Sequence, residues 1–334
     1  MILASIFRKE KGEKNMKLSV IVPVYNLERY VAATLDSLLD IAFPYEYEII
    51  VINDGSTDNS RSIIEAYQSR TEKIILLNIE NGGVSNARNV GAEKARGEYI
   101  TFVDGDDTVE KTFFETAVRE LEEQGCDFVQ ANLRLVSGPK AEYDQFTQED
   151  MLLTDKKDML MHFFGPAKII SNSVCGKVFR ADLIRNKTFD PSLRIAEDQK
   201  FVFDAICTSR SIKLLRTIGY NYYQRADSAM HALDRKRAGD ILKVLEYCRD
   251  NVDSQEIRTA IDADRLDILF FVYHDSVING DNQEAVVQEI AAMDEPSLRA
   301  VMSRKARTKL FALMHARRLY DLALKGNHRL KNNR

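Results

Sequence analysis

Three carboxylates crowd into four residues, directly after a short apolar run of the chain. They are Asp104, Asp106 and Asp107, and the run before them, Tyr99–Val103, has the composition of a buried strand. Carboxylates this close repel one another, so a bound cation would compensate their charge, and their oxygens suit hard ions such as Mg²⁺ or Mn²⁺. The EF-hand pattern does not fit, because Val109 stands where its turn requires glycine. A helix N-terminus enriched in acidic residues is the remaining alternative.

A second acidic pair, Glu197-Asp198, opens the segment Glu197–Ser209, whose apolar spacing is helical. Capping of that helix and a favourable contact with its dipole would explain the pair without any catalytic role. The functional alternative is a general base that faces a hydroxyl group of an acceptor. The residue types alone are compatible with both.

A third polar segment, Asn81–Asn89, enters a predicted helix through two glycines. The fingerprint GxGxxG is absent, which disfavours a dinucleotide site. The glycines can bring backbone close to a ligand and Arg88 can neutralise a phosphate, whereas the alternative is an ordinary turn and a solvated arginine. His231 lies in a polar stretch with Arg225 and is a further candidate for holding an anion, although a lone histidine is more often structural.

Strands and helices alternate through about the first 130 residues, which predicts a parallel sheet covered by helices on both faces. The expected strands are Leu18–Val24, Tyr47–Asn53, Lys73–Asn78, Tyr99–Val103 and Asp127–Ala131. The expected helices are Glu28–Leu39, Asn59–Arg70, Val84–Ala95 and Glu110–Gln124. Three strands end in polar segments: Pro23–Asn26, Asp54–Asp58 and Asp104–Asp107. Because ligands bind beyond the carboxyl ends of parallel strands, we expect these segments to meet at one edge of the sheet.

The pattern changes after about residue 137. Residues 138–196 are mixed, with a helix expected near Asp155–Phe164, and Ile212–Tyr223 is expected to be extended. From about residue 233 onward the apolar spacing is helical. We therefore expect an N-terminal extension at residues 1–16, an α/β domain at 17–235 and a helical domain at 236–334.

The composition excludes several classes of protein. Hydrophobic residues make up 45% and charged residues 29% of the 334 residues, which excludes wholesale disorder. No apolar run approaches the roughly 20 residues that cross a bilayer. Met1–Lys17 places its charges after a short apolar patch, unlike a secretory signal, so we expect a cytoplasmic protein. The four cysteines form no CxxC pair, which favours reduced thiols over a metal or redox motif.

Basic residues are concentrated at the C-terminal end of the chain. The net charge is −4, yet residues 301–334 carry ten Lys and Arg and one acidic residue, Asp321. Such a segment predicts either a solvated basic helix or contact with a polyanionic substrate, a membrane surface or an acidic subunit. Five apolar residues of the segment follow helical spacing and predict a buried face opposite the basic one: Leu310, Leu313, Met314, Tyr320 and Leu324.

Five segments of the chain, in order, resemble the motif blocks of family 2 glycosyltransferases of the GT-A fold, which are inverting enzymes that use a nucleotide-activated sugar. The segments are Ser19–Asn26, Ile50–Asp58, Gly83–Gly91, Gly97–Asp107 and Ala196–Phe201. The resemblance covers residues 17–232. It implies an α/β fold with a mixed, mainly parallel sheet between helices and a helical C-terminal region, and it implies sugar transfer from a UDP-sugar to a hydroxyl group.

The resemblance also implies roles for individual residues. Asp198 would be the general base, with Glu197 shaping its position. Asp106 would bind a Mg²⁺ or Mn²⁺ ion on the diphosphate, with Asp104 beside the ribose and the metal. Asp54 would contact uracil. The residues implied to bind the nucleotide sugar are Pro23, Val24, Tyr25, Asn26, Asp54, Asn86, Arg88, Asp104, Gly105, Asp106 and His231.

A closer resemblance is to the wall teichoic acid N-acetylglucosaminyltransferases that decorate polyribitol phosphate. It rests on the AEDQxF form of the segment from Ala196, on Ser228 and His231 in a Ser-x-x-His pattern, and on Met302-Ser303-Arg304. The chain departs from these enzymes at Ala87-Arg88-Asn89, where they often have Pro-Arg-Asn. The resemblance implies transfer of GlcNAc or a related hexose to a cell-surface glycopolymer such as teichoic acid. Capsular or exopolysaccharide synthesis on a lipid-linked oligosaccharide is the alternative.

The partners implied are a UDP-sugar donor and a polymeric or lipid-linked glycan acceptor, which can be polyanionic, but no nucleic acid. Peripheral association with the inner face of the cell membrane and homo-oligomers formed through the C-terminal helices are further expectations. Two other classes stay open. A sugar-nucleotide pyrophosphorylase would need a Gly-rich phosphate loop and a basic residue in the turn Val24–Leu27, and a non-catalytic glycan-binding module would not need both Asp106 and Asp198.

Overall fold

The computed structural model describes residues 16–137, 140–144, 146–224, 234–293 and 295–332. The chain forms two compact units, each assembled from three separate segments. The first unit comprises Met1–Gln145, Cys175–Thr188 and Leu215–Tyr223, and the second comprises Phe146–Val174, Phe189–Leu214 and Gln224–Arg334. This division differs from the boundary expected near residue 235, because two earlier segments cluster with the C-terminal helices.

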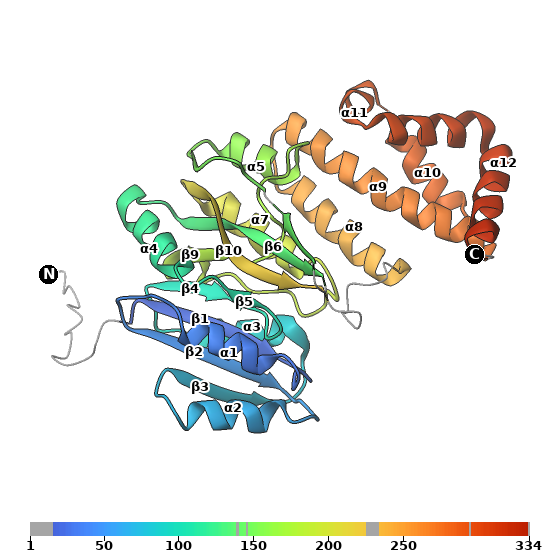
Figure 1. Ribbon diagram of the computed structural model, residues 1–334. Helices are drawn as coiled ribbons and strands as arrows, with labels where there is room; N and C mark the ends of the chain where they lie inside the picture. The colour runs from blue at the N-terminus through green and yellow to red at the C-terminus, as the bar shows by residue number, and fades with distance from the viewer. Residues whose placement is uncertain (1–15, 138–139, 145, 225–233, 294, 333–334) are drawn as a thin grey trace, which may run out of the picture. The chain divides into compact units, whose positions relative to one another are not determined.

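A mixed β-sheet forms the centre of the first unit, with the hydrogen-bonded order β3-β2-β1-β4-β9-β6-β10-β5 (Figure 1). In chain order the strands are β1 Leu18–Val24, β2 Tyr47–Asp54, β3 Ile74–Ile79, β4 Tyr99–Phe102, β5 Thr108–Val109, β6 Phe128–Ser137, β7 Lys140–Asp144, β9 Lys177–Arg180 and β10 Ile212–Tyr223. Strands β1 to β4 are parallel. Strand β9 is antiparallel to both β4 and β6, so β6 runs in the same direction as β4. The predicted strand directions are therefore confirmed, while the insertion of β9 was not predicted.

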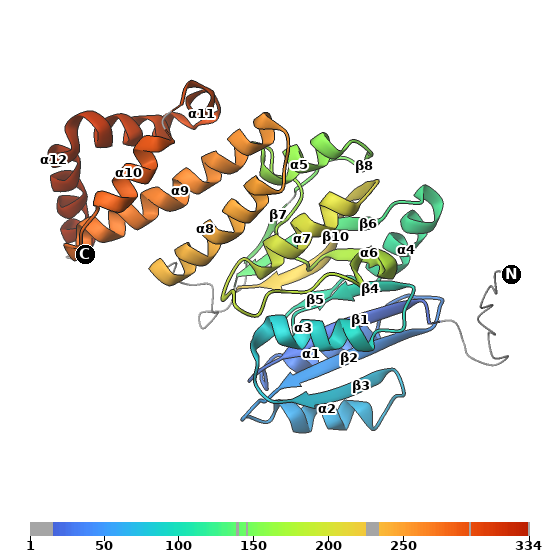
Figure 2. The ribbon, with the colours of Figure 1, turned by 180° about the vertical axis from the view of Figure 1, so that it is seen from behind.

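Helices cover both faces of this sheet, which is why every residue of β1 and β2 is buried. Helix α1 (Val31–Leu39) lies in front of the sheet in Figure 1, and α3 (Gly83–Lys94) lies in front of it in Figure 2. A Cβ atom on Gly91 would come within 2.4 Å of Cγ2 of Ile21 and 2.8 Å of Cδ1 of Ile52, so glycine allows α3 to approach β1 and β2 closely. The other helices of this unit are α2 Ser60–Gln68, α4 Phe113–Gln124 and α6 Ala181–Ile184.

The second unit is mainly helical, as the C-terminal apolar spacing predicts. Its helices are α5 Lys156–Phe164, α7 Glu197–Thr208, α8 Arg235–Asp250, α9 Gln255–Asn279, α10 Glu284–Ala292, α11 Pro296–Val301 and α12 Arg304–Asn332. The short strand β8 (Met151–Leu153) pairs with the first residues of β10. None of the helices among the described residues has the length and apolarity needed to cross a bilayer.

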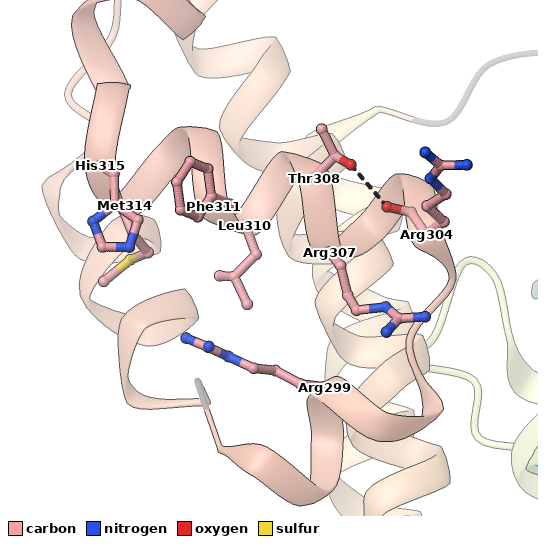
Figure 3. Close-up of a pocket in the computed structure, with 8 residues that line it drawn as sticks. All are labelled: Arg299, Arg304, Arg307, Thr308, Leu310, Phe311, Met314 and His315. Atoms are coloured by element: carbon pink, nitrogen blue, oxygen red, sulfur yellow. Dashed lines mark hydrogen bonds between the residues drawn. The ribbon is translucent and has the colours of Figure 1, made fainter.

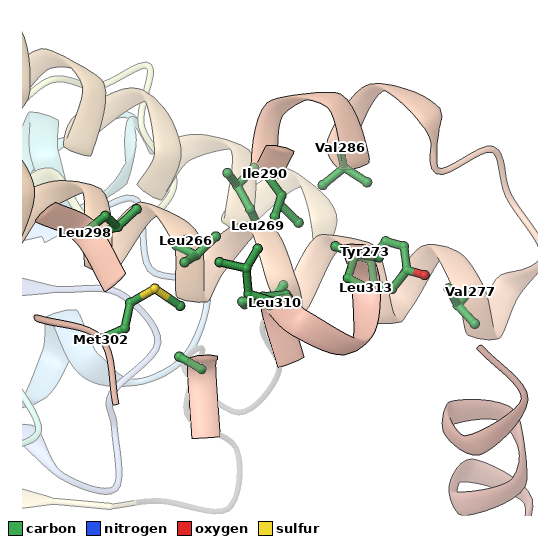
Figure 4. Close-up of a cluster of buried hydrophobic side chains, with 12 residues drawn as sticks. Leu266, Leu269, Tyr273, Val277, Val286, Ile290, Leu298, Met302, Leu310 and Leu313 are labelled. Atoms are coloured by element: carbon green, nitrogen blue, oxygen red, sulfur yellow. The ribbon is translucent and has the colours of Figure 1, made fainter. Parts of the chain in front are cut away.

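A cluster of buried hydrophobic residues holds α9, α10, α11 and α12 together (Figure 4). Leu310 and Leu313 belong to it, and Tyr320 and Leu324 pack against it, as their spacing predicts. The prediction for Met314 was wrong: its side chain is 40% exposed, because the buried stripe of α12 follows Ala306, Leu310 and Leu313 and leaves Met314 outside it. At Ala316 the backbone is not helical, so α12 bends there.

Candidate active site

The predicted meeting of the strand ends is confirmed by hydrogen bonds between the loops after β1 and β2. Oδ1 of Asn26 accepts from the backbone N–H of Thr57 at 2.8 Å, and the backbone N–H of Asn26 donates to Oγ of Ser56 at 3.1 Å. Asn26 has φ of 52°, a left-handed conformation that asparagine tolerates better than most residues. Tyr25 beside it is 49% exposed, so a broad aromatic face is available at this edge.

The acidic turn after β4 lies against the end of β1. A Cβ atom on Gly105 would come within 2.9 Å of the carbonyl oxygen of Pro23 and of Cγ2 of Val24. Glycine is therefore required for this close approach. The contact brings the end of β1 together with the turn that carries Asp104 and Asp106, as the sequence predicts.

Asp54 makes a connection that the sequence does not reveal. Its two carboxylate oxygens accept from the backbone N–H groups of Gly82 and Gly83 at 2.8 and 2.9 Å, and its side chain is buried. Gly83 has φ of +84°, which favours glycine at the start of α3. Asn86 follows in the first turn, and a Cβ atom on Gly82 would meet its Nδ2 at 2.6 Å. Asp54 thus fixes the glycine turn, and its contact with uracil stays a prediction.

Arg88 is buried rather than solvated. Its Nη2 donates to Oδ1 of Asp104 at 2.8 Å, with the guanidinium side chain 4% and the carboxylate side chain 31% exposed. A buried ion pair of this kind orients the carboxylate, because both groups lose freedom. The solvated alternative is therefore wrong, and direct contact of Arg88 with a phosphate stays a prediction.

Asp107 is the member of the acidic turn for which the family resemblance implies no role. The hydroxyl group of Tyr220 donates to Oδ2 of Asp107 at 2.7 Å and accepts from the backbone N–H of Asp104 at 3.1 Å. The backbone N–H of Tyr223 donates to the other Asp107 oxygen at 2.8 Å. Burial, followed by the charges of Asp104 and Asp106, raises the pKa of Asp107 to about 8. The Tyr220 hydroxyl group thus bonds to both Asp104 and Asp107 and holds the acidic turn in one conformation.

The acidic turn fits a divalent cation. Asp104 and Asp106 are both partly exposed. Asp107, which bonds to Tyr220, is buried. Burial is the main cause of the raised pKa of Asp107, and the smaller contribution, repulsion from Asp104 and Asp106, is the interaction that a bound cation would relieve. Within the described ranges no group of three or more His, Cys, Asp or Glu side chains could hold a metal. Two carboxylates suit Mg²⁺, which commonly takes its other ligands from water and phosphate oxygens.

Asp198 lies in the second unit, in the first turn of α7. Its Oδ2 accepts from the backbone N–H of Val174 at 3.1 Å and from Oγ of Ser173 at 3.4 Å. The carboxylate is thus held by a loop distant in sequence, which plain helix capping does not require. Ala196 just before the pair has φ of 67°, an uncommon conformation for a residue with a side chain and one that clusters at functional sites. Glu197 is partly buried beside it.

The structure thus brings together Pro23, Asn26, Gly105 and the acidic turn, and it joins Arg88 to Asp104. Asp198 belongs to the other compact unit. His231 and Arg225 lie outside the described residues.

Comparison with known proteins identifies the class to which this fold and site belong. Residues 19–186, half of the chain, match the family described as Glycosyl transferase family 2. The chain therefore belongs to family 2 of the glycosyltransferases. The crystal structure of Staphylococcus aureus TarS 1-349 in complex with UDP-GlcNAc is similar, with a TM-score of 0.70, 26% identity, and coverage of 95% of this chain and 92% of that one. This similarity confirms the expected GT-A fold with a helical C-terminal region.

Curated relatives show which members of the family are similar. The uncharacterized glycosyltransferase EpsJ of Bacillus subtilis is 34% identical over 216 residues, covering 63% of this chain and 62% of EpsJ. The poly(ribitol-phosphate) beta-N-acetylglucosaminyltransferase TarS of S. aureus is 31% identical over 211 residues, covering 62% of this chain and 35% of TarS. The chain thus spans less than two thirds of the length of either relative. The mannosyltransferase PcManGT of Pyrobaculum calidifontis, in complex with GDP-Man and Mn²⁺, shares the fold at 16% identity, with a TM-score of 0.56 and coverage of 93% of this chain and 86% of that one.

Proposed function

We propose that this protein transfers a hexose, GlcNAc or a close relative, from a UDP-sugar to a hydroxyl group of a cell-surface glycopolymer such as teichoic acid. The observation that carries the proposal is the acidic turn, in which Asp104 is oriented by Arg88 and the turn is anchored through Asp107 and Tyr220. Two carboxylates at the carboxyl edge of parallel strands are suited to a nucleotide diphosphate with its cation, and one of them, Asp104, is held by Arg88.

The donor would be bound by the strand ends of the first unit. Pro23–Asn26 would hold the nucleobase together with Asp54, and Asp104 would face the ribose. Asp106 and Asp104 would hold Mg²⁺ or Mn²⁺, which when bound neutralises charge on the leaving diphosphate. Arg88 favours one orientation of Asp104, since the guanidinium group that pairs with it is buried.

The acceptor would be activated by Asp198. An inverting transfer needs one base on the acceptor hydroxyl and no covalent intermediate on the protein. Hydrogen bonds from Val174 and Ser173 hold one oxygen of the carboxylate, so the direction of the side chain is set before the acceptor binds. Glu197 would help to position it. His231 would contact the diphosphate or the sugar.

The sugar is suggested by relatives whose names describe two hexoses. TarS is named for N-acetylglucosaminyl transfer, and a poly(ribitol-phosphate) beta-glucosyltransferase of Bacillus spizizenii is 32% identical over 220 residues. We therefore place UDP-GlcNAc first and UDP-glucose second among the donors. Both names describe poly(ribitol-phosphate), which supports a phosphate-rich polymer as the acceptor.

The test is a screen of UDP-GlcNAc, UDP-glucose, UDP-galactose and GDP-mannose with Mg²⁺ or Mn²⁺, read first as protection against thermal unfolding. A ligand that binds the native state raises its apparent stability by about 2.7 kcal/mol at 100 times its Kd. Release of UDP is then measured with and without poly(ribitol phosphate). Acceptor-dependent release from a UDP-sugar supports the proposal. Pyrophosphate chemistry would support a pyrophosphorylase, and binding without turnover would support a glycan-binding module.

A further inference from the structure

A pocket of about 600 Å³ lies within the C-terminal helices of the second unit, apart from every residue assigned above (Figure 3). Its walls come from α11 and α12 and consist of Arg299, Arg304, Arg307, Thr308, Leu310, Phe311, Met314 and His315. Three arginines and a histidine are thus among the residues that line one pocket. Among these lining residues none is acidic, so an anionic group is the natural ligand.

The same pocket has an apolar end. Figure 3 shows Phe311, Met314 and His315 gathered at one end of the pocket, while Arg304 and Arg307 lie at the other. Phe311 is 66% and Met314 40% exposed, although the adjacent residue Leu310 is buried in the cluster of Figure 4. A ligand that contacted both the arginines and the apolar side chains would carry a negative charge next to a hydrocarbon group.

Two more large apolar side chains of α12 are exposed. Beyond the bend at Ala316, Leu319 is 70% and Leu322 67% exposed. By sequence, α12 carries nine Lys and Arg and one acidic residue, Asp321. A helix that combines large exposed apolar side chains with a strong positive charge has the composition of a helix that lies in a membrane interface.

We propose that α11 and α12 bind the surface of an anionic phospholipid bilayer, with a lipid headgroup phosphate in the arginine pocket and Phe311 in the acyl boundary. A hydrophilic phosphate polymer would use the arginines but would leave Phe311, Leu319 and Leu322 exposed to water, so the apolar residues favour lipid. The proposed function does not depend on this surface, because the donor and base residues lie elsewhere.

The experiment is co-sedimentation of the full-length chain with vesicles of phosphatidylcholine alone and with added phosphatidylglycerol. We expect binding only to the anionic vesicles. The double variant Arg304→Gln/Arg307→Gln should lower the partition coefficient about 30-fold, because each basic residue near such a surface contributes roughly fivefold. Phe311→Ser should lower it roughly tenfold even at high salt, since its contribution is apolar. All three side chains are exposed, so folding should be retained.

Matched controls separate this site from general charge. Arg70→Gln/Lys94→Gln removes the same charge from exposed positions of the first unit and should leave vesicle binding unchanged. Equal binding to neutral vesicles, or unchanged binding in the pocket variants, would overturn the proposal. So would binding of soluble poly(ribitol phosphate) that is lost in the arginine variant while no vesicle binds, because the occupant would then be a polymer. A dimer that disappears in Phe311→Ser, again without vesicle binding, would identify a second copy of the chain as the occupant.

Discussion

The acidic turn of the first unit and helix α12 of the second both carry many charged residues. The charged groups of the turn are paired or hydrogen-bonded, whereas arginines of α12 are exposed. In the turn, Asp104 is paired with buried Arg88, and Asp107 is bonded to Tyr220 and Tyr223. On α12, Arg304 and Arg307 stand exposed around an open pocket. A small ligand such as a nucleotide diphosphate is bound best by side chains that are held in one orientation. An extended anionic surface can be bound by many flexible basic side chains.

The largest expected effect is loss of metal-dependent transfer in Asp106→Ala. The variant removes a carboxylate predicted to hold the cation, whose stabilisation of the leaving group is worth several kcal/mol. Turnover with Mg²⁺ or Mn²⁺ should fall to background, as it should in the wild type with a chelator. Exposed Glu72→Ala is the control for loss of an acidic group. Full turnover of Asp106→Ala would show that the turn is only a fixed structural feature.

Asp198→Asn should lower turnover by about 10²–10⁴-fold, the usual contribution of a general base. Donor affinity should not change, because the substitution is nearly isosteric and Asp198 is proposed to act on the acceptor. Titration of the UDP-sugar by calorimetry and steady-state kinetics measure the two quantities separately. Asp158→Asn removes an acidic group from the first turn of α5 and is the matched control for a helix-terminal effect. If the two variants behaved alike, Asp198 would be a dipole-stabilising residue and not a base.

Tyr220→Phe should destabilise the protein by about 1–3 kcal/mol, because buried Asp107 and the backbone of Asp104 each lose a partner. It should also weaken the metal dependence of donor binding, since the turn loses its anchor. Urea unfolding measures the first effect and a Mn²⁺ titration of donor binding the second. Among the described residues, the Tyr223 hydroxyl group has one hydrogen bond, a weak one of 3.5 Å from Thr108, so Tyr223→Phe should change stability little. Equal losses of stability in both variants would argue against a specific role of the Tyr220 hydroxyl group in holding the acidic turn.

The smallest expected effect is a pH dependence within the helical region. Burial, with added repulsion from Lys309 and Lys305, lowers the pKa of His274 from 6.5 to about 4. Between these pH values the unfolded chain binds more protons than the folded chain. The contribution of neutral His274 to stability is therefore fully present above pH 6.5 and is lost as the pH falls toward 4. His274→Gln can still bond the Tyr320 hydroxyl group, which lies 2.6 Å from the ring, and should flatten this decline. Urea midpoints at pH 7 and pH 4.5 measure it. An undiminished decline in the variant would assign the effect to other groups.

The sequence predicts the sheet well where apolar runs are continuous, as in β1 and β2, and it predicts the meeting of polar strand ends because parallel strands share an edge. It does not predict β9, whose four residues carry no clear period. The pairing of Asp107 with Tyr220 joins residues 113 positions apart, and such contacts depend on tertiary register. The predicted burial of Met314 was wrong because the buried stripe of α12 is narrower than helical spacing suggests.

The structure also changes how the basic tail should be tested. Deleting residues 301–334 would harm acceptor use if the tail meets an anion, but it would also remove Met302, Ala306, Leu310 and Leu313 from the buried cluster. Exposing the remaining apolar residues would destabilise the second unit. Substitutions of exposed Arg304 and Arg307 therefore separate charge from folding.

In the proposed reaction, donor and acceptor react directly, with Asp198 as base and no covalent intermediate on the protein. The most direct measurement is proton NMR of the product formed from UDP-GlcNAc, whose sugar is α-linked, and a poly(ribitol phosphate) acceptor in the presence of Mn²⁺. Direct displacement predicts a β-linked product from the first turnover, in step with UDP release. An α-linked product, or UDP release with free sugar as the sole product at saturating acceptor, would contradict direct displacement.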